Sequence, residues 1–301
     1  MKHLEAVEHS EEKTIHANGI EIVYDTFGAP SDPAMLLIMG LGEQLIAWDE
    51  ELCRQLAGKG YWVIRFDNRD VGLSTKFDEA GVPDLLALTQ GAATEVPYTL
   101  EDMAEDAVGL LEGLGVEAAH VVGVSMGGMI AQTIAINHPQ RVLTLTSIMS
   151  STSDPRLPPP KPEAGLLLYA PSPTDRAGYI EYSVKTWRVL GGPCFPINEE
   201  RIREFAGRVY DRGRHPAGFA RQLAAILASG SRKSPLKSVH APTLVIHGDA
   251  DPLIPVEAGK DTAETIAGAK LVIIEGMGHD LPPAIWPEIV AVITDHAAQT
   301  G

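Results

Sequence analysis

The feature that most constrains the fold is an alternation of short apolar runs with stretches of helical periodicity. Runs of this length, bounded by turn residues, are typical of strands that are buried on both faces. They lie at residues 34–40, 61–67, 119–124, 141–150, 241–248 and 269–276, and helical patterns at 47–60, 99–115, 126–138, 256–267 and 283–299 separate most of them. An Asn18-Gly19 turn also predicts a hairpin at 14–28. Short joints between strands and helices predict an α/β fold, with a mostly parallel central sheet flanked by helices.

The alternation is interrupted once, between residues 151 and 235. Residues 151–163 are rich in proline, which disfavours a regular helix or strand, and residues 172–230 have helical patterns with no strand between them. A helical block inserted into such a sheet is expected to lie over one edge as a lid. We therefore expect an α/β core from residues 1–150 and 236–301 and a helical lid (cap) from residues 151–235.

Composition and charge narrow the class of partner. The 301-residue chain has 24 basic and 40 acidic residues, a formal net charge of −16, and this average field repels nucleic acid and anionic membrane surfaces. No apolar stretch is long enough to span a membrane, and the charged N-terminal segment lacks the apolar region of a secretory signal. We therefore expect a cytoplasmic protein without a nucleic acid or membrane partner. Nothing in the sequence indicates an oligomeric state.

The pentapeptide Gly-Val-Ser-Met-Gly at residues 123–127 lies between a predicted strand and a predicted helix. In that context the pattern G-x-S-x-G is typical of a sharp turn that holds a reactive serine above the carboxyl ends of the strands, and glycine is needed two residues to either side. The alternative is an ordinary serine that caps the helix after a glycine turn. We expect Ser125 to be a nucleophile.

A serine nucleophile needs a base to take its proton, and the usual base is a histidine oriented by a carboxylate. Among the ten histidines, His279 follows the last predicted strand in a glycine-bracketed loop. Asp251 follows the preceding strand, where Asp249 is expected to brace the loop, and Asp154 is a further candidate for the acid. The order serine, aspartate, histidine is the one expected for such an elbow.

An attacked carbonyl becomes an oxyanion, which needs hydrogen-bond donors already aimed at it. One expected donor is the backbone N–H of Met126, at the start of the helix after Ser125, where the helix dipole also helps. The second is expected from the glycine-rich loop at residues 39–44, and we select the N–H of Leu41. The alternative is that this loop is merely flexible. The Gln44 side chain is a possible additional donor to the substrate.

These motifs resemble those of the α/β-hydrolase superfamily. "GVSMGG" resembles its nucleophile elbow, "GDADPLIP" its acid loop and "GMGH" its histidine loop. "LLIMGLG", "VIRFDNRDVGLST", "HVVGVSMGGMIAQ" and "IEGMGHDLP" resemble more narrowly the bacterial esterases of the aclacinomycin methylesterase group, over about residues 15–295.

Two departures from the relatives bear on the site. Many of them have His-Gly where this chain has Met39-Gly40, but the donor there is a backbone N–H, so methionine need not abolish the oxyanion hole. Segment 76–98 looks longer than in the methylesterases.

In "DNRDVGLST", Asp67, Arg69 and Asp70 are expected to form a structural charge network rather than to act in catalysis.

The resemblance and the serine together imply acyl transfer, because alkyl-enzyme chemistry on this fold needs a carboxylate nucleophile. Ser125 is expected to attack, His279 to move the proton and Asp251 to orient the imidazole, with water releasing the acid. No metal or organic cofactor is required. The expected substrates are small to medium carboxylic esters, and Tyr182 and Trp187 of the lid are candidates for binding them.

Other functions fit the same residues. Lactone hydrolysis, carbon–carbon bond hydrolysis and perhydrolysis use the same three side chains. A ligand receptor with this fold and little or no turnover is a possibility from a different class, because a fold does not fix a function.

Overall fold

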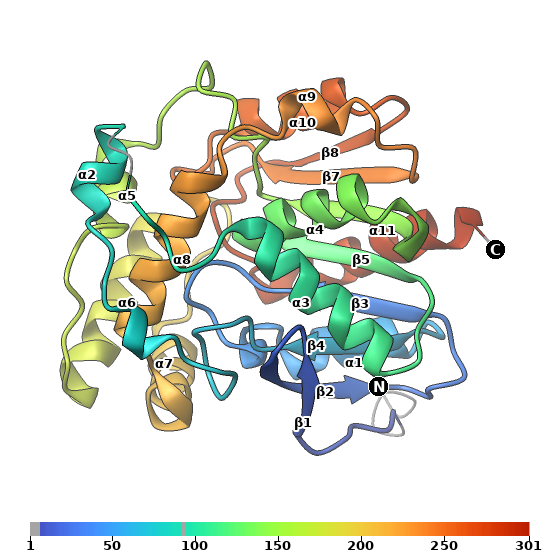
Figure 1. Cartoon of the computed structure of the whole chain (residues 1–301), viewed down its shortest axis with the longest axis horizontal. Helices are drawn as coiled ribbons and strands as arrows, with labels where there is room; N and C mark the ends of the chain where they lie inside the picture. The colour runs from blue at the N-terminus through green and yellow to red at the C-terminus, as the bar shows by residue number, and fades with distance from the viewer. Residues whose placement is uncertain (1–6, 92–93, 301) are drawn as a thin grey trace.

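The computed structural model describes residues 7–91 and 94–300. Residues 1–6 and 301, at the ends of the expected core ranges, and residues 92–93 of the 76–98 segment lie outside the described residues. An eight-stranded sheet has the order β1-β2-β4-β3-β5-β6-β7-β8 (Figure 1). Its strands are β1 (Lys13–Ala17), β2 (Ile20–Phe27), β3 (Ala34–Ile38), β4 (Trp62–Phe66), β5 (Ala119–Val124), β6 (Val142–Ile148), β7 (Thr243–Gly248) and β8 (Lys270–Ile274).

The sheet is mostly parallel, as the alternation predicts. Strands β3 to β8 pair in parallel, and only β1 with β2 and β2 with β4 pair antiparallel. The predicted hairpin turn is present, with Asn18 and Gly19 both at positive φ (47° and 77°), which matches the twist of a two-residue hairpin.

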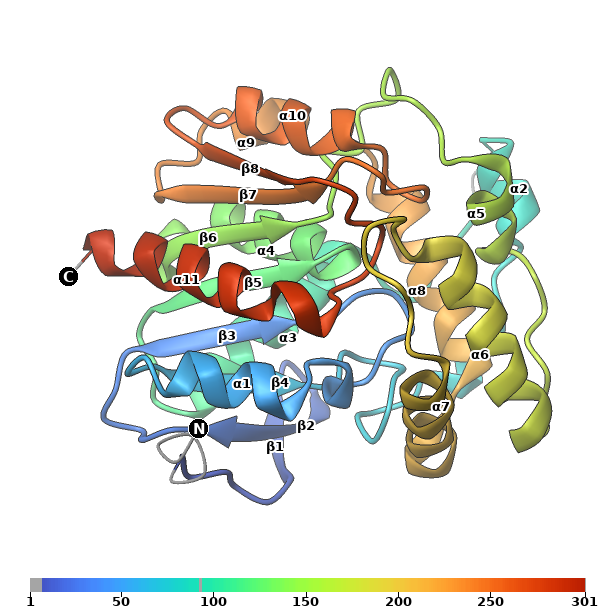
Figure 2. The ribbon, with the colours of Figure 1, turned by 180° about the vertical axis from the view of Figure 1, so that it is seen from behind.

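Helices cover both faces of the sheet (Figures 1 and 2). One face carries α3 (Leu100–Gly113), α4 (Met126–Asn137), α9 (Lys233–Leu236) and α10 (Val256–Thr265), and the other carries α1 (Glu50–Ala57) and α11 (Trp286–Ala297). Each layer buries its own apolar cluster, because successive residues of a buried strand point to opposite faces. Short 3-10 helices complete the chain at η1 (Leu45–Ala47), η2 (Asp78–Ala80), η3 (Pro139–Arg141), η4 (Pro283–Ile285) and η5 (Ala298–Thr300).

The helical block lies at the carboxyl ends of the parallel strands (Figure 2). It consists of α5 (Pro162–Leu167), α6 (Arg176–Leu190), α7 (Glu199–Gly213) and α8 (Pro216–Ser229). The expected boundary between residues 235 and 236 falls inside α9, whose Leu236 is fully buried in the core cluster. Helix α9 therefore packs with the sheet rather than with the block. No helix among the described residues is long and apolar enough to cross a membrane.

Segment 76–98, which looks longer than in the methylesterases, contains two short helical elements. Besides η2, it forms the short helix α2 (Leu85–Thr89), capped by the Asp84 carboxylate, which accepts the Ala87 N–H. Helix α2 packs against α8. A five-residue helix is not stable alone in water, so we attribute the stability of α2 to its contact with α8. No local sequence pattern predicts this contact.

The charges of residues 67–70 tie the helical block to the core. Asp70 forms a bidentate ion pair with Arg221 of α8, with both nitrogen–oxygen distances at 2.7 Å, and Asp67 pairs with Arg212 of α7 at 2.8 Å. Arg69 pairs with Asp106 of α3 at 2.6 Å. The predicted structural charge network is thus confirmed, and it extends into α7 and α8.

Candidate active site

Ser125 occupies the turn between β5 and α4. Its backbone has φ 54° and ψ −120°, a conformation that non-glycine residues rarely adopt and that is stored as strain at functional sites. It stands at the N-cap position of α4, yet its side chain makes no capping hydrogen bond. The alternative of a simple capping serine is therefore wrong.

The glycines around Ser125 are required by close backbone contacts. A Cβ on Gly123 would lie 2.1 Å from the Gly127 carbonyl oxygen, and one on Gly127 would lie 2.1 Å from that of Ile38. Both distances are far inside van der Waals contact, and neither neighbour is a flexible side chain. Only glycine at these two positions lets the strand turn this sharply into the helix.

His279 connects the serine to the acid. Its Nε2 lies 3.0 Å from Ser125 Oγ, and its Nδ1 lies 2.7 Å from Asp251 Oδ2. An ionised carboxylate only accepts hydrogen bonds, so Asp251 fixes the proton on Nδ1 and leaves Nε2 free to accept from the serine hydroxyl. The three residues predicted for catalysis therefore form one hydrogen-bonded chain in the order required for proton transfer.

The acid is itself held in place. The other oxygen of Asp251 accepts the backbone N–H groups of Leu253 and Ile254, each at 2.8 Å. Burial by itself would raise the pKa of Asp251, but the charge and hydrogen bond of His279, together with the Ile254 N–H, hold that pKa below its ordinary value. The carboxylate stays ionised at neutral pH, as orientation of an imidazolium requires.

The other two candidate acids are otherwise engaged. Asp249 accepts the Gly276 N–H at 2.6 Å and so braces the acid loop against the histidine loop, as expected. The candidacy of Asp154 is wrong, because its carboxylate is bound by Arg156 at 2.6 Å and by Lys233 at 3.0 Å.

The loop after β3 lies directly beside the serine. A Cβ on Gly40 would be 3.3 Å from Ser125 Cβ, and a turn follows in which the Glu43 N–H donates to the Gly40 carbonyl at 3.3 Å. Leu41 occupies the first central position of this turn. Within the described part of the chain its N–H has no acceptor. Met126 is the first residue of α4, where backbone N–H groups lack intrahelical partners.

A glutamine from the helical block holds this turn. The Oε1 atom of Gln222 in α8 accepts the Gly42 N–H at 2.8 Å, and its Nε2 donates to the Arg69 carbonyl at 2.7 Å. The side chain is completely buried. The turn that carries Leu41 is therefore positioned from the helical block as well as from the sheet.

Gln44 does not lie as a substrate donor would. Its Nε2 donates to the Val209 carbonyl and its Oε1 accepts from Arg212, both at 2.9 Å. These bonds tie the loop to α7, which corrects the expectation that the amide faces the substrate.

Tyr182 and Trp187, the other two predicted substrate residues, lie half-buried on α6. The end of α6 reaches the histidine loop, where the His279 N–H donates to the Leu190 carbonyl at 2.8 Å. Their part in binding a substrate stays a prediction.

Two acidic residues near the site were missed by sequence reasoning. Burial raises the pKa of Glu43 to about 7 and that of Asp280, next to His279, to about 6. The signal was present in both cases, since each is an acid directly beside a predicted site residue or loop. What the sequence does not show is that protein surrounds these carboxyl groups.

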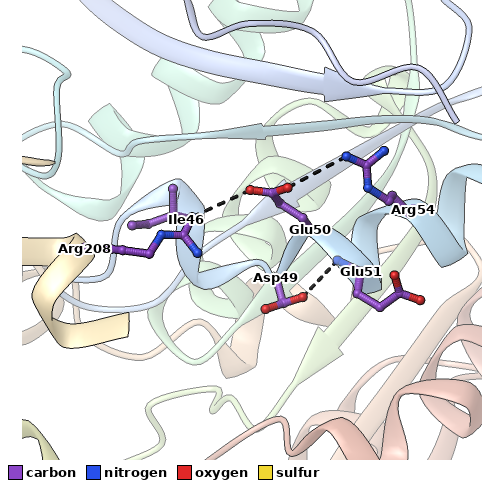
Figure 3. A pocket seen from close by; sticks show the side chains of 6 residues that line it. All are labelled: Ile46, Asp49, Glu50, Glu51, Arg54 and Arg208. Atoms are coloured by element: carbon purple, nitrogen blue, oxygen red, sulfur yellow. Dashed lines mark hydrogen bonds and ion pairs between the residues drawn. The ribbon is translucent and has the colours of Figure 1, made fainter. Parts of the chain in front are cut away.

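A surface hollow of about 330 Å³ is lined by Ile46, Asp49, Glu50, Glu51, Arg54 and Arg208 (Figure 3). Charged side chains of α1 and α7 border it, and the Glu50 carboxylate pairs with Arg54 and Arg208 across it. None of its lining residues is a predicted site residue. Both arginines of the hollow thus already pair with Glu50, and its other charged residues, Asp49 and Glu51, are acidic.

Comparison with known proteins gives consistent matches. A family model described as alpha/beta hydrolase fold matches residues 33–282. The chain is 31% identical to rhodomycin D methylesterase DauP of Streptomyces sp. (strain C5), over 95% of each chain, and 32% identical to DnrP of Streptomyces peucetius, over 89% of this chain and 92% of the relative. An enol-lactonase of Burkholderia xenovorans has a similar structure, with a TM-score of 0.75 at 22% identity, covering 95% of this chain and 100% of that one.

Proposed function

Because this chain belongs to the alpha/beta hydrolase fold family, we propose that it is a serine hydrolase that cleaves carboxylic esters through an acyl-enzyme on Ser125. The observation that carries the proposal is the position of His279, within hydrogen-bond distance of both Ser125 Oγ and Asp251. The strained backbone of Ser125 adds to it, because such strain persists only where the surrounding structure maintains it.

The geometry supports a two-step reaction. His279 Nε2 takes the hydroxyl proton as Ser125 Oγ attacks the acyl carbon, and the same nitrogen then gives that proton to the leaving alkoxide. Water repeats the sequence on the acyl-enzyme and releases the acid. Asp251 stabilises the imidazolium that forms in each step, and it does so without taking up the proton.

The oxyanion of each tetrahedral intermediate lies, in this proposal, between the N–H groups of Leu41 and Met126. The Leu41 N–H has no other acceptor in the described chain, and the Met126 N–H belongs to the unpaired first turn of α4. Both donors are backbone groups, so Met39 in place of the histidine of many relatives leaves them intact. Their value lies in being fixed before charge develops.

The ester class follows from the relatives together with the site. Two relatives that match this chain almost end to end are named as methylesterases. Helices α5 to α8, which we propose act as a lid, lie at the carboxyl ends of the parallel strands (Figure 2), and Ser125 directly follows one of these strands, β5. We therefore propose small to medium carboxylic esters as substrates, with Tyr182 and Trp187 of α6 among the residues that contact them.

A labelling and turnover experiment tests the proposal. A fluorophosphonate probe should label wild-type protein and the surface variant Ser238→Ala, but not Ser125→Ala, and only the first two should cleave a p-nitrophenyl ester panel of graded acyl length. Absence of labelling would contradict the role of Ser125. Labelling without turnover of any ester or lactone would favour a ligand receptor instead.

A further inference from the structure

The carboxylate of Glu43 lies close to the reacting serine. Glu43 is the fourth residue of the turn that begins at Gly40, and a β-turn keeps its first and fourth Cα atoms within about 7 Å of each other. Gly40 in turn touches Ser125, since a Cβ there would be 3.3 Å from Ser125 Cβ. A substrate of moderate size bound at Ser125 is therefore within reach of the Glu43 side chain.

This carboxylate has no partner in the described part of the chain. Nearby cations are already engaged: Arg212 pairs with Asp67, and Arg214 bonds to Ser172 and stacks on the Tyr179 ring at 4.7 Å. The charge of Glu43 raises the pKa of Tyr179 on α6, so the Glu43 carboxylate lies near the helical block. Within the described residues this carboxylate forms neither a hydrogen bond nor an ion pair, although the Glu43 backbone N–H donates to Gly40.

The Glu43 side chain is largely surrounded by protein, but it is not fully buried. Protein surrounds it closely enough that desolvation raises its pKa to about 7, and yet the residue keeps accessible surface. These two facts are compatible when the carboxylate borders a narrow space rather than packing against neighbours. An unpaired carboxylate in such a place destabilises the fold unless a ligand binds it. Acids with a strongly shifted pKa are found mainly at functional sites.

We propose that Glu43 recognises a positively charged group, an ammonium, on the ester substrate. This inference rests on the proposed function. An ammonium supplies both the charge and the hydrogen-bond donors that the carboxylate lacks. The formal net charge of −16 would also draw a cationic ester toward the protein. A divalent cation is a poorer occupant, because it needs several oxygen ligands and the described residues contain no group of three acidic, histidine or cysteine side chains that could hold one.

A matched pair of esters tests the proposal. The p-nitrophenyl ester of 4-(trimethylammonio)butanoate and that of 5,5-dimethylhexanoate have nearly the same shape and differ in one charge, and a second pair carries a primary ammonium or a methyl group. We would measure kcat/KM at pH 8.5, where Glu43 is ionised, for wild type, Glu43→Gln, Glu43→Met and the exposed control Glu51→Gln.

We expect wild type and Glu51→Gln to prefer the charged ester of at least one pair by about tenfold or more, as charged hydrogen bonds and ion pairs do. Both Glu43 variants should lose that preference, whereas Glu51→Gln should keep both the preference and the wild-type activity on the neutral ester. Their melting temperature should not fall, because an unpaired buried charge is removed. A preference that survives in both variants, or none in wild type despite turnover of the neutral ester, would overturn the inference alone. No turnover of any ester would overturn the proposed function, and the inference with it.

Discussion

Replacing Gln222 by methionine should loosen the turn at residues 40–43, which carries the proposed oxyanion donor Leu41, without changing any of the three reacting side chains. Gln222 lies on α8, 180 positions along the chain from Gly42, and its amide holds the Gly42 N–H and the Arg69 carbonyl. Methionine has a similar unbranched shape and makes neither bond. The buried Arg69 carbonyl and the partly buried Gly42 N–H would then lack partners, at a cost of up to about 1–3 kcal/mol each to the free energy of unfolding.

The effect on catalysis should be smaller than loss of the donor itself. Removing an oxyanion donor costs about 2.7–4 kcal/mol, whereas Gln222→Met only frees the turn that carries Leu41. We therefore expect kcat to fall about tenfold, equivalent to about 1.4 kcal/mol. KM should change little, because the donors bind the charged intermediate far more strongly than the neutral ester.

Steady-state kinetics on a p-nitrophenyl ester, with thermal melts of each variant, separates the two effects. Gln132→Met is the matched control, since Gln132 is also fully buried with both ends of its amide bonded, to Ser147 and Arg232. It should melt at a lower temperature with unchanged kcat. Gln222→Glu keeps an acceptor for Gly42 and should retain more activity than Gln222→Met. The reasoning is refuted if Gln222→Met melts lower while its kcat equals that of wild type.

Three further results are expected. Asp251→Asn should lower kcat by about 10⁴-fold in the same ester assay, because an amide no longer selects the tautomer that leaves Nε2 free; a loss below tenfold would contradict this role. Arg221→Met should lower the free energy of unfolding in urea by about 3–5 kcal/mol, since it leaves the buried Asp70 carboxylate without its arginine, whereas exposed Arg176→Met should change it by less than about 1 kcal/mol. Burial lowers the pKa of His120 from 6.5 to about 4, so the unfolded chain takes up this proton at a higher pH than the folded protein does, and the stability present above pH 6.5 is lost as pH falls toward 4. The free energy of unfolding of His120→Gln should therefore fall less than that of wild type between pH 7 and pH 5. An equal fall in both proteins would contradict the role given to His120.

The sheet and the reactive loops could be predicted because their causes are local. Apolar runs mark strands wherever they are buried on both faces, and parallel strands bring their carboxyl ends to one edge. Loops after three different strands therefore place Ser125, Asp251 and His279 near one another, and this can be predicted without knowing any distance between them. The elbow glycines follow from the same argument, since the clashes they avoid lie within a few residues or on the adjacent strand.

The contacts between core and helical block could not be predicted in this way. Whether Gln44 faces a substrate or α7 depends on how α7 docks, and its partners are 165 and 168 positions away. The same holds for Gln222, which looks like any polar residue of an amphipathic helix until its burial is known. Helix α2 belongs here too, because its support comes from α8.

The ion pairs of Asp67 and Asp70 set limits on chimeras made by exchanging helices between relatives. A grafted α7 or α8 without an arginine at the position of Arg212 or Arg221 would leave Asp67 or Asp70 buried without its ion-pair partner. A chimera that exchanges only α5 and α6, with the junction before Glu199, would keep Arg212 and Arg221 together with the aspartates that they pair with. Recombination is therefore easier in the first half of the block, and diversity introduced by shuffling should be sought there.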